Sequence, residues 1–414
     1  MLMEHVTREN LKGKKFTKVD PELDGLGSLG LYVHIPFCKS LCPYCPYTRE
    51  VFRKEKEEKY LKAVKKELDL YSSRLENPKI ESFYFGGGTP SIMVDGLVEI
   101  IDHAKEKFNI KSDVAIEANP DDLDERNLRK LWDGGVRKLS IGVQSFDDST
   151  LRRIGRLSHD AEIAEKATLS AKDMGFKDLN IDLMFNLPGQ SLWDLEQDLN
   201  KALEIRPGQI TIYPLTLFAY TKMYRDLRDD GKKENGKMEK RMYRLILDLF
   251  NDSDYEQINA WSFAEKGVDK YGSVERSDYI GIGAGAMSAL PFQTYSNTFF
   301  LDEYEKSVEK GKLPIAFGSS SDKKEAKIQW FMLRLYDLRI SKREFEERFG
   351  DDIESLRPII RGMKISGILE ESGDIIRVKR PFAVHSITKT FLETFISRVQ
   401  EEGFKEPWPK EFSI

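Results

Sequence analysis

The sequence predicts an α/β protein with a partial (βα)6-type barrel and a C-terminal winged-helix-like α+β domain. From residue 29 onward, short runs rich in β-branched and aromatic residues alternate with amphipathic helical stretches, which is the pattern of parallel strands joined by helices. Each of these runs ends in residues of distinctive chemistry. A helix-capping sequence and a hairpin turn near the C-terminus predict the second domain.

Six strands and five helices are expected in the barrel. In the first helix, Tyr60, Leu61, Val64 and Leu68 recur at helical spacing between charged residues. The alternation fits an open barrel, a closed barrel or a doubly wound sheet. The strands are expected at Leu31–Ile35, Ser82–Phe85, Val114–Ala118, Lys138–Val143, Leu179–Met184 and Gln209–Tyr213. The helices are expected at Lys54–Leu75, Val94–Phe108, Asp124–Gly134, Asp160–Gly175 and Leu192–Ile205.

Polar residues at the strand ends favour a barrel-type functional site. In α/β barrels, functional groups gather at the C-terminal ends of the strands, where the loops of all units meet. The six predicted strands end, in order, at the loop that begins with Cys38, at Gly86-Gly87-Gly88-Thr89-Pro90, at Glu117-Ala-Asn-Pro, at Gln144-Ser-Phe, at Asp182 and at Tyr213-Pro. We therefore expect a single site at this rim.

Composition and charge exclude several classes of protein. The 65 Lys and Arg residues nearly balance the 70 Asp and Glu residues, and the net charge of −5 gives no general attraction to nucleic acid or anionic lipid. No apolar run is long enough to span a membrane, and no hydrophobic leader directs secretion. We expect a cytoplasmic protein with no nucleic-acid partner.

Four segments are expected along the chain. Residues 1–28 form a polar arm with Lys12, Lys14, Lys15 and Lys18, which we expect to be a solvated terminus rather than a binding patch. The barrel covers residues 29–225, a connector at the barrel mouth covers 226–323, and the winged-helix-like domain covers 324–414.

The three cysteines of the chain, Cys38, Cys42 and Cys45, lie together on one short loop. Disulfides are a poor interpretation, because an odd count leaves one thiol free. Three thiolates can bind a soft metal or three irons of an iron–sulfur cluster, which leaves the fourth iron open to another ligand. A structural zinc with His34 as fourth ligand is the alternative, although such sites usually join two separated pairs of ligands.

The motif CxxxCxxC, preceded by Tyr32-Val-His-Ile-Pro-Phe, resembles the radical S-adenosylmethionine (SAM) superfamily. More narrowly, it resembles the branch with oxygen-independent coproporphyrinogen III dehydrogenases and heme chaperones. The resemblance implies a [4Fe-4S] cluster held by the three cysteines, whose unique iron is chelated by SAM. It also implies that an electron from a donor such as flavodoxin or ferredoxin splits SAM into methionine and a 5′-deoxyadenosyl radical.

The resemblance also assigns the SAM site. It implies that the glycine run contacts the amino group of SAM, and that Tyr32 lies near the sulfonium. Carboxylates suit the ribose hydroxyls of SAM, and a guanidinium suits its carboxylate. The resemblance also implies catalytic roles for Tyr32, Glu117 and Arg156. The alternative to SAM binding is that Glu117 and Asp182 are paired polar groups inside the barrel. The expected SAM contacts are Tyr32, Gly86, Gly87, Gly88, Thr89, Glu117, Gln144, Arg156 and Asp182.

A second glycine-rich run, Tyr279–Ala286, lacks the spacing of a dinucleotide-binding fingerprint. The resemblance implies that this segment closes the barrel mouth and places Gly283 and Ala284 near a second SAM molecule or the substrate. A tight structural loop explains the run equally well.

The C-terminal region has the pattern of a winged helix. Ser341-Lys-Arg-Glu344 is a capping box for a helix that ends at Gly350, and Gly373-Asp374 turns a hairpin. Winged helices often bind DNA, but acidic residues at the start of the next helix would repel phosphates. A substrate lid or packing domain is the better interpretation. The acidic residues are Asp351, Asp352 and Glu354.

Two departures from the family pattern bear on function. Coproporphyrinogen dehydrogenases carry a further cysteine where this chain has Tyr47. Heme chaperones carry a His-Asn-x-x-Tyr-Trp motif where this chain has Lys270-Tyr-Gly-Ser-Val-Glu-Arg, and no histidine lies between His159 and His385. Any heme ligand must therefore come from elsewhere, such as His34, His159, His385, a methionine or a tyrosine.

The function expected from these patterns is that of a radical SAM enzyme acting on a tetrapyrrole or another aromatic substrate. C-methylation is one candidate reaction, since branch members that use two SAM molecules tolerate an aromatic residue at position 47. The alternatives are a coproporphyrinogen III dehydrogenase, a non-catalytic heme-binding or trafficking protein, and a zinc-stabilised interaction protein.

Overall fold

The computed structural model describes residues 13–176, 178–229, 236–267 and 278–414. Six parallel strands form the central part of its largest sheet, and each strand lies beside the next one along the chain. A doubly wound sheet would reverse its strand order, so the predicted barrel-type α/β fold is confirmed. The strands are β2 (Ser28–Ile35), β5 (Lys79–Gly87), β7 (Val114–Ala118), β8 (Val136–Gln144), β9 (Asp178–Phe185) and β10 (Gln209–Pro214).

The barrel is partial, because its two outermost strands pair with other strands instead of with each other. Next to β10 lie β12 (Ser262–Glu265) and β11 (Tyr255–Gln257), both antiparallel. Next to β2 lies the parallel strand β13 (Tyr279–Ile282). The sheet continues through β14 (Met287–Leu290), β15 (Gln293–Asn297) and β16 (Ile315–Ser320). The region expected to be a connector thus extends the same sheet.

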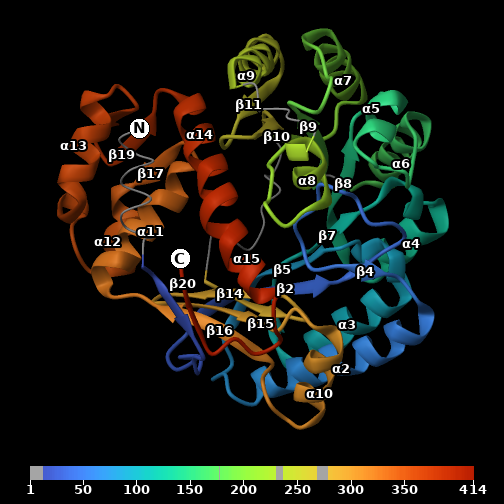
Figure 1. Cartoon of the computed structure of the whole chain (residues 1–414), viewed down its shortest axis with the longest axis vertical. Helices are drawn as coiled ribbons and strands as arrows, with labels where there is room; N and C mark the ends of the chain where they lie inside the picture. The colour runs from blue at the N-terminus through green and yellow to red at the C-terminus, as the bar shows by residue number, and fades with distance from the viewer. Residues whose placement is uncertain (1–12, 177, 230–235, 268–277) are drawn as a thin grey trace.

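The helices between the strands follow the sequence prediction closely. Only the short α5 (Asp148–Arg153) was not predicted within this part of the barrel. Helices α2 and α3 lie on one side of the sheet in Figure 1. The predicted helices are α2 (Lys54–Ser72), α3 (Val94–Lys107), α4 (Glu125–Asp133), α6 (Ala161–Met174) and α7 (Leu192–Ile205).

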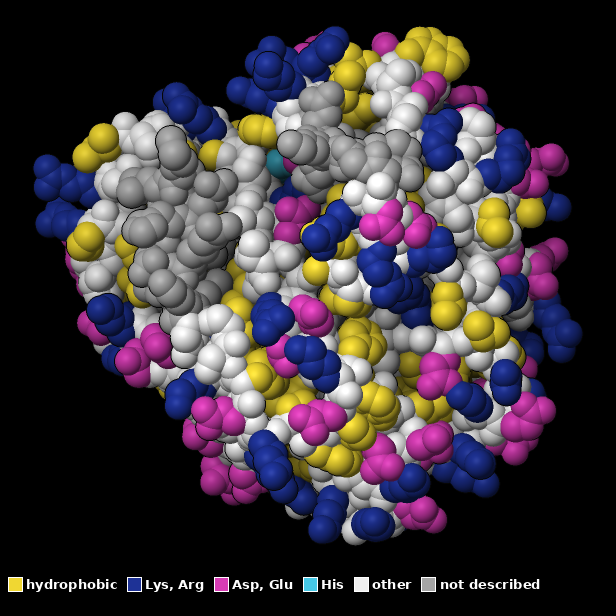
Figure 2. Space-filling model, in the orientation of Figure 1, with side chains coloured by type: hydrophobic (Ala, Val, Ile, Leu, Met, Phe, Trp, Pro, Cys, Tyr) yellow, Lys and Arg dark blue, Asp and Glu magenta, His cyan; other side chains and the backbone are white. Residues whose placement is uncertain are grey.

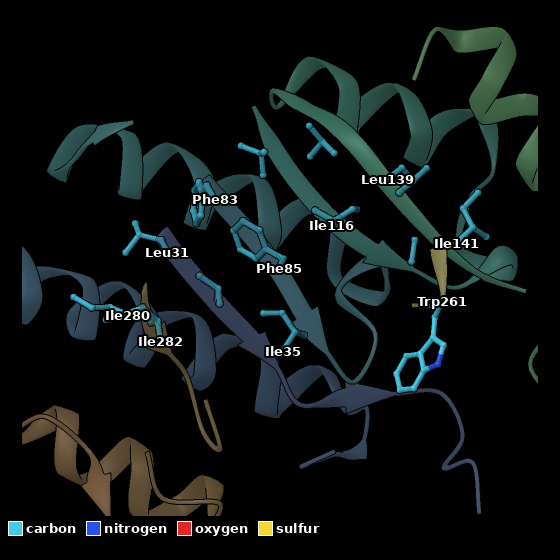
Figure 3. Packing of buried hydrophobic residues seen from close by; sticks show 14 of the residues in the cluster. Leu31, Ile35, Phe83, Phe85, Ile116, Leu139, Ile141, Trp261, Ile280 and Ile282 are labelled. Atoms are coloured by element: carbon cyan, nitrogen blue, oxygen red, sulfur yellow. The ribbon is translucent and has the colours of Figure 1, made fainter. Parts of the chain in front are cut away.

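One face of the barrel strands forms the hydrophobic core. Leu31 pairs with Phe83 and Phe85 pairs with Ile116 on neighbouring strands, and all four are almost fully buried. Figure 3 shows these side chains next to one another on adjacent strands. Burial contributes about 1.5–3 kcal/mol for each such side chain. The alternate residues point to the opposite face, which is the inside of the barrel and is largely polar.

The N-terminal arm differs from the prediction. Residues Lys15–Thr17 form β1, which lies between β16 and β20 (Glu411–Ser413). Phe16 is buried, and its ring stacks on Phe412 at 5.0 Å between centroids. One aromatic residue in a polar run anchors this segment through pairing with distant strands, and the local sequence pattern gives no sign of such pairing. Lys12 lies outside the described residues.

The C-terminal region has the expected winged-helix-like arrangement. Three helices, α11 (Lys323–Leu335), α12 (Lys342–Phe349) and α13 (Arg357–Ile365), accompany a small sheet. Ser341 caps α12 by accepting a hydrogen bond from the Glu344 amide at 3.2 Å, and Gly350 ends that helix in the left-handed conformation. The sheet contains β17 (Arg339–Ser341) and the hairpin of β18 (Leu369–Ser372) and β19 (Ile375–Val378).

A long C-terminal helix connects the winged-helix-like region to the barrel. It consists of α14 (Pro381–Phe391), a π turn (Leu392–Ile396) and α15 (Ser397–Gly403), and runs down the middle of Figure 1. Ser397 accepts a hydrogen bond from the Ala219 amide at 3.2 Å, in the loop that follows β10. Tyr220 in this loop donates to the Pro46 carbonyl at 2.8 Å, so the helix touches the cysteine loop through one intermediate.

The remaining elements are short or lie at the periphery. Acidic and basic side chains are interspersed on the face shown in Figure 2. None of the helices in the described ranges combines the length and hydropathy that a membrane span requires. The elements are β3 (Phe37–Cys38), β4 (Glu50–Val51), β6 (Asn109–Ile110), α8 (Lys222–Asp229), α9 (Gly236–Asn251), α10 (Leu301–Glu309) and the 3-10 turns Pro90–Met93, Pro120–Asp122 and Ile353–Leu356.

Candidate functional site

The cysteine loop lies at the C-terminal end of β2. Cys38 ends β3, which pairs with β4 on the far side of the loop, and the Cys45 amide donates to the Cys42 carbonyl at 3.2 Å. Cys38 and Cys42 are buried, and Cys45 is half-buried. Tyr44 packs among buried residues of several segments, including Ile154 at the end of α5 and Met184 of β9. This packing fixes the loop on the barrel rim.

Side chains from two other parts of the chain, Thr89 and Arg156, contact cysteine sulfurs. Thr89 Oγ1 lies 3.4 Å from Cys38 Sγ, and Arg156 Nη1 lies 3.4 Å from Cys42 Sγ. Burial raises the pKa of the Cys38 thiol to about 11 and also raises the pKa of Cys45. Burial therefore disfavours the thiolate forms of Cys38 and Cys45, and positive iron ions would stabilise them.

His34 does not suit the role of fourth zinc ligand. Its Nε2 lies 2.8 Å from the Thr48 carbonyl oxygen, which can only accept, so Nε2 carries the proton. Its Nδ1 then accepts from the Tyr32 hydroxyl at 3.0 Å. Burial lowers the pKa of His34 to about 4, so the ring is neutral. Both ring nitrogens are thus occupied within the protein.

The donor set fits an iron–sulfur cluster better than a single metal ion. In the described part of the chain, no group of three or more His, Cys, Asp or Glu side chains is arranged to hold one metal ion. Three thiols on one loop, without a fourth protein ligand beside them in that part, match a [4Fe-4S] cluster that keeps one iron for another ligand.

A chain of polar contacts joins the cysteine loop to the ends of β5 and β7. Lys39 Nζ pairs with Asp122 at 2.5 Å, and Asp122 accepts from the Ser91 hydroxyl at 2.8 Å. The Ser91 hydroxyl in turn accepts from the Asn119 amide at 3.0 Å. Lys39 lies inside the CxxxCxxC motif and Asn119 inside the Glu117-Ala-Asn-Pro run, whereas Ser91 and Asp122 lie one and two positions beyond their motifs. Sequence alone does not show the pairing of these residues.

Arg156 closes this chain of contacts. Its Nη2 donates to the Gly142 carbonyl at 2.9 Å and to the Asn119 side-chain carbonyl, while its Nη1 contacts Cys42. Its Nε is buried and has no hydrogen-bond partner among the described residues. A buried donor without a partner beside the cysteines is the feature expected where an anionic ligand group binds.

Glu117 lies at the end of β7 among aromatic residues. It accepts from the Tyr84 hydroxyl at 2.9 Å and from the Gly87 amide at 3.2 Å. The Tyr84 ring stacks against Tyr32, with 6.1 Å between centroids. Glu117 and Tyr32, predicted from separate motifs, are therefore brought together through Tyr84, which the sequence analysis did not identify.

The glycine run is explained by contacts within the protein. A Cβ on Gly86 would lie 2.9 Å from Glu117, and one on Gly88 would lie 2.7 Å from the Phe37 carbonyl oxygen. Gly87 has a φ of +112°, and a Cβ there would lie 2.5 Å from the His34 ring. The sequence analysis attributed these glycines to close approach of a ligand. The structure shows that they also make room for neighbouring protein groups.

Gln144 ends β8 in a left-handed conformation, with a φ of +70°. Its side-chain oxygen accepts from the Tyr213 hydroxyl at 2.6 Å. The turn that follows is held by Asp198 of α7, which accepts from the Ser145 hydroxyl at 2.8 Å and from the Phe146 amide at 2.6 Å. The sequence analysis missed Asp198. The available signal was a lone acidic residue on the buried face of this helix.

Asp182 lies inside the barrel, one strand from Gln144. It accepts from the Ser140 hydroxyl at 3.0 Å and from the Asn180 side-chain amide at 2.9 Å. Burial raises its pKa to about 6. A second line of hydrogen bonds runs from Asn180 to Thr211 at 2.9 Å. The inner face around Asp182 is thus a polar lining able to bind a polar ligand.

Gly283 and Ala284 use their amides inside the protein. The Gly283 amide donates to Glu67 at 2.8 Å, and the Ala284 amide donates to the Tyr60 hydroxyl at 3.1 Å. Gly283 has a φ of +106°, and a Cβ there would collide with Tyr60. These contacts favour the structural-loop interpretation of this run over the second SAM site.

The candidate heme-binding histidines are also engaged. His385 contacts Glu239 at 2.8 Å through Nε2 and accepts from the Trp261 indole at 2.9 Å through Nδ1. His159 contacts the Val143 carbonyl at 3.0 Å and the Ser158 hydroxyl at 3.1 Å. Neither ring has a nitrogen left for iron without rearrangement. The segment Lys270–Arg276, which was compared with the chaperone motif, lies outside the described residues.

Comparison with known proteins shows the family to which this chain belongs. The Radical SAM superfamily profile matches residues 32–202, which include the three cysteines and the predicted SAM contacts up to Asp182. The heme chaperone HemW of Escherichia coli strain K12 is 30% identical over 279 residues, covering 64% of this chain and 71% of that protein. The heme chaperone HemW of Bacillus subtilis strain 168 is 27% identical over 352 residues, covering 82% and 92%.

Two further proteins to which the chain is similar are named as coproporphyrinogen III oxidases. The oxygen-independent coproporphyrinogen III oxidase of Helicobacter pylori strain 26695 is 27% identical over 352 residues, covering 79% of this chain and 76% of that protein. The solved structure of coproporphyrinogen III oxidase (HemN) from Escherichia coli superposes with a TM-score of 0.77 at 20% identity, covering 95% and 93%, and shows the shared fold. The chain therefore belongs to the radical SAM superfamily, in the branch of HemW and oxygen-independent coproporphyrinogen III oxidase.

Proposed function

We propose that this chain is a radical SAM enzyme that holds a [4Fe-4S] cluster on Cys38, Cys42 and Cys45, cleaves SAM reductively and acts on a tetrapyrrole. The observation that supports this proposal most strongly is the position of Arg156. Its guanidinium contacts Cys42 and the end of β7 and keeps a buried Nε without a partner in the described residues.

The protein residues would bind and orient SAM beside the cluster. With SAM bound, the cluster supplies one-electron reduction of the sulfonium. Arg156 would bind the carboxylate of SAM, because its planar guanidinium offers paired donors. Glu117 and Asp182 would accept hydrogen bonds from ribose hydroxyls. Tyr32 would lie against the sulfonium with its hydroxyl directed to His34.

Gln144 and the glycine run would complete this binding site. Gln144 is held at the rim by the hydrogen bond from Tyr213 and by the hydrogen bonds that Asp198 accepts from the turn after Gln144. Gly86, Gly87, Gly88 and Thr89 lie on the strand end next to the cysteine loop, and Thr89 contacts Cys38. A single SAM molecule is proposed, because Gly283 and Ala284 direct their amides into the protein.

The proposed substrate class rests on the relatives, whose names concern heme and coproporphyrinogen. Those names favour oxidation of a tetrapyrrole over C-methylation, for which none of the relatives described above gives support. Non-catalytic heme binding is a second candidate function, favoured by the similarity to HemW. The engaged histidines support the enzymatic alternative, because they offer no ready axial ligand.

The test is to incubate anaerobically reconstituted, reduced protein with SAM and candidate tetrapyrroles, and to analyse the products by mass spectrometry. We expect release of 5′-deoxyadenosine and a mass change in the tetrapyrrole that depends on SAM. Arg152→Gln is a matched control for Arg156→Gln, because Arg152 is exposed on the same segment. Heme binding without any SAM cleavage would instead support the non-catalytic function.

A further inference from the structure

The segment that follows β10 contacts the cysteine loop on both sides of Cys45. The Met223 amide donates to the Pro43 carbonyl at 3.0 Å, and the Tyr220 hydroxyl donates to the Pro46 carbonyl at 2.8 Å. Pro46 directly follows Cys45 in the chain, so the second contact lies one residue from a proposed iron ligand. The first contact is made by the backbone, whereas the second depends on a single side chain.

Contacts within the cysteine loop hold a different part of it. Arg49 donates to the Cys42 carbonyl at 2.8 Å and to the Tyr47 carbonyl at 2.9 Å. These acceptors lie within seven residues of Arg49, whereas Tyr220 reaches Pro46 across 174 residues of sequence. Tyr220 therefore ties the loop to another part of the molecule.

The C-terminal helix α15 holds Tyr220 in turn. The side-chain amide of Gln400, which is buried, contacts the Tyr220 hydroxyl. The Tyr220 ring packs against Phe404, with 5.3 Å between centroids. A phenol has one proton to donate and the Pro46 carbonyl can only accept, so both contacts form when the Gln400 amide turns its nitrogen toward the hydroxyl. The hydroxyl then joins α15 to the cysteine loop, as acceptor on one side and donor on the other.

Two further features keep this linkage in place. Burial raises the pKa of Tyr220, and the neighbouring Cys45 raises it further, so the hydroxyl keeps its proton at neutral pH and remains a donor. Ser397, one turn before Gln400, accepts from the Ala219 amide at 3.2 Å. The helix and the segment after β10 are thus joined at successive positions.

We propose that Tyr220 is a positioning residue: its hydroxyl holds the cysteine loop in the geometry in which the three sulfurs converge, and Gln400 holds Tyr220. Hydrogen bonds around metal ligands orient those ligands, and their loss commonly lowers metal affinity about tenfold or more. The C-terminal helix thereby supports the cluster site, although all three cysteines lie on the loop after β2. The proposal rests on the proposed [4Fe-4S] site, and its first test uses the protein without iron so that the two can fail separately.

The first test measures how fast the cysteines of the iron-free full chain react with iodoacetamide. All three cysteines of the chain lie on this loop, so every modified thiol reports on it. Tyr220→Phe removes the hydroxyl and keeps the ring. We expect Cys45, which is half-buried, to react about fivefold faster in this variant, as loss of one hydrogen bond predicts. Tyr224→Phe, at a half-buried tyrosine of α8, is the matched control and should react at the original rate.

Gln400 gives a second expectation, because it acts through Tyr220. Gln400→Leu keeps most of the side-chain volume and removes the amide, so Cys45 should react faster, but by less than in Tyr220→Phe. The double variant should react at the rate of Tyr220→Phe, since residues that act through one contact do not have additive effects. Additive effects would show that Gln400 acts independently and would overturn the proposed linkage.

The second test is electron paramagnetic resonance of the reduced, reconstituted protein. Tyr220→Phe should change the shape of the cluster signal and release iron to a chelator faster, whereas a tyrosine that only stabilises the fold would leave the shape unchanged. Unchanged thiol reactivity and an unchanged signal in Tyr220→Phe, or an equal response in Tyr224→Phe, would overturn the proposal. The expected thiol rates in a protein that takes up no cluster would refute only the proposed function.

Discussion

The guanidinium of Arg156 lies 3.4 Å from the sulfur of Cys42, although 114 residues separate them in the sequence. The same guanidinium donates to Asn119 at the end of β7 and to Gly142 within β8. One side chain thus joins the cysteine loop to two strands of the barrel. Arg156 therefore lies beside both the proposed cluster site and the proposed SAM site.

Replacement of Arg156 by glutamine should impair SAM binding and cleavage. The variant loses a charged group at the proposed carboxylate site, so kcat/KM for SAM should fall about tenfold to hundredfold. The measurement is 5′-deoxyadenosine release at varied SAM concentration. Arg152→Gln should retain the original value, and an equally active Arg156→Gln variant would remove Arg156 from the site.

Asp198 should act as a positioning residue for Gln144. Asp198→Ala removes acceptors for Ser145 and Phe146 and should cost about 1–3 kcal/mol in the free energy of unfolding. The turn would loosen, so the KM for SAM should rise more than kcat falls. Gln197→Ala, exposed on the same helix, is the control. Asp198→Asn keeps an acceptor and should restore most of the SAM affinity, whereas a merely structural residue would leave KM unchanged.

Asp198 also predicts a pH dependence of stability. Burial raises its pKa from 3.8 to about 7 in the folded protein. The folded state therefore retains a proton that the unfolded chain has lost. This stabilising contribution is complete below the unfolded pKa and is lost as the pH rises through the folded pKa, between about pH 4 and 7. Urea denaturation across this range should show a smaller decline in Asp198→Asn than in the original protein.

Substitution of Gly87 should be far more costly than substitution of another glycine with a positive φ. Gly87→Ala combines a left-handed backbone with a contact of 2.5 Å to the His34 ring. Gly311 has a φ of +71° and open space around its Cα. Gly311→Ala should lose about 1–2 kcal/mol from the backbone alone. Chemical denaturation should show a clearly larger loss for Gly87→Ala, and equal losses would contradict the packing described here.

Heme added to the protein should not show a spectrum of histidine ligation by His34, His159 or His385. Both nitrogens of each ring are engaged within the protein. His103 contacts Asp69 through Nε2, and His5 lies outside the described residues. An imidazole signal would therefore trace to His103 or His5 and disappear in the double variant His5→Ala/His103→Ala. A histidine-type spectrum that persists in this variant would contradict the assignment.

The barrel could be predicted from the sequence, because a local hydrophobic pattern indicates each of its strands and most of its helices. All six parallel strands and the helices between them, apart from α5, follow from alternating hydrophobic patterns, and the strand-end rule brings Glu117, Gln144 and Asp182 to one rim. The contacts between residues of the site could not be predicted from the sequence. Asp198 and Tyr84 act through partners far away in sequence, and the β1 strand depends on pairing with distant segments. The glycine run was found, but the sequence does not show which neighbouring protein groups leave no room for a Cβ there.

The most direct test of the central claim is electron paramagnetic resonance of the reduced, reconstituted protein with and without SAM. The account predicts a reduced [4Fe-4S] signal whose shape changes when SAM is added, because the open iron gains a ligand. A variant with alanine at Cys38, Cys42 and Cys45 should show no such signal while keeping its circular dichroism. A cluster signal that SAM leaves unchanged, or one that survives in the triple variant, would contradict the account.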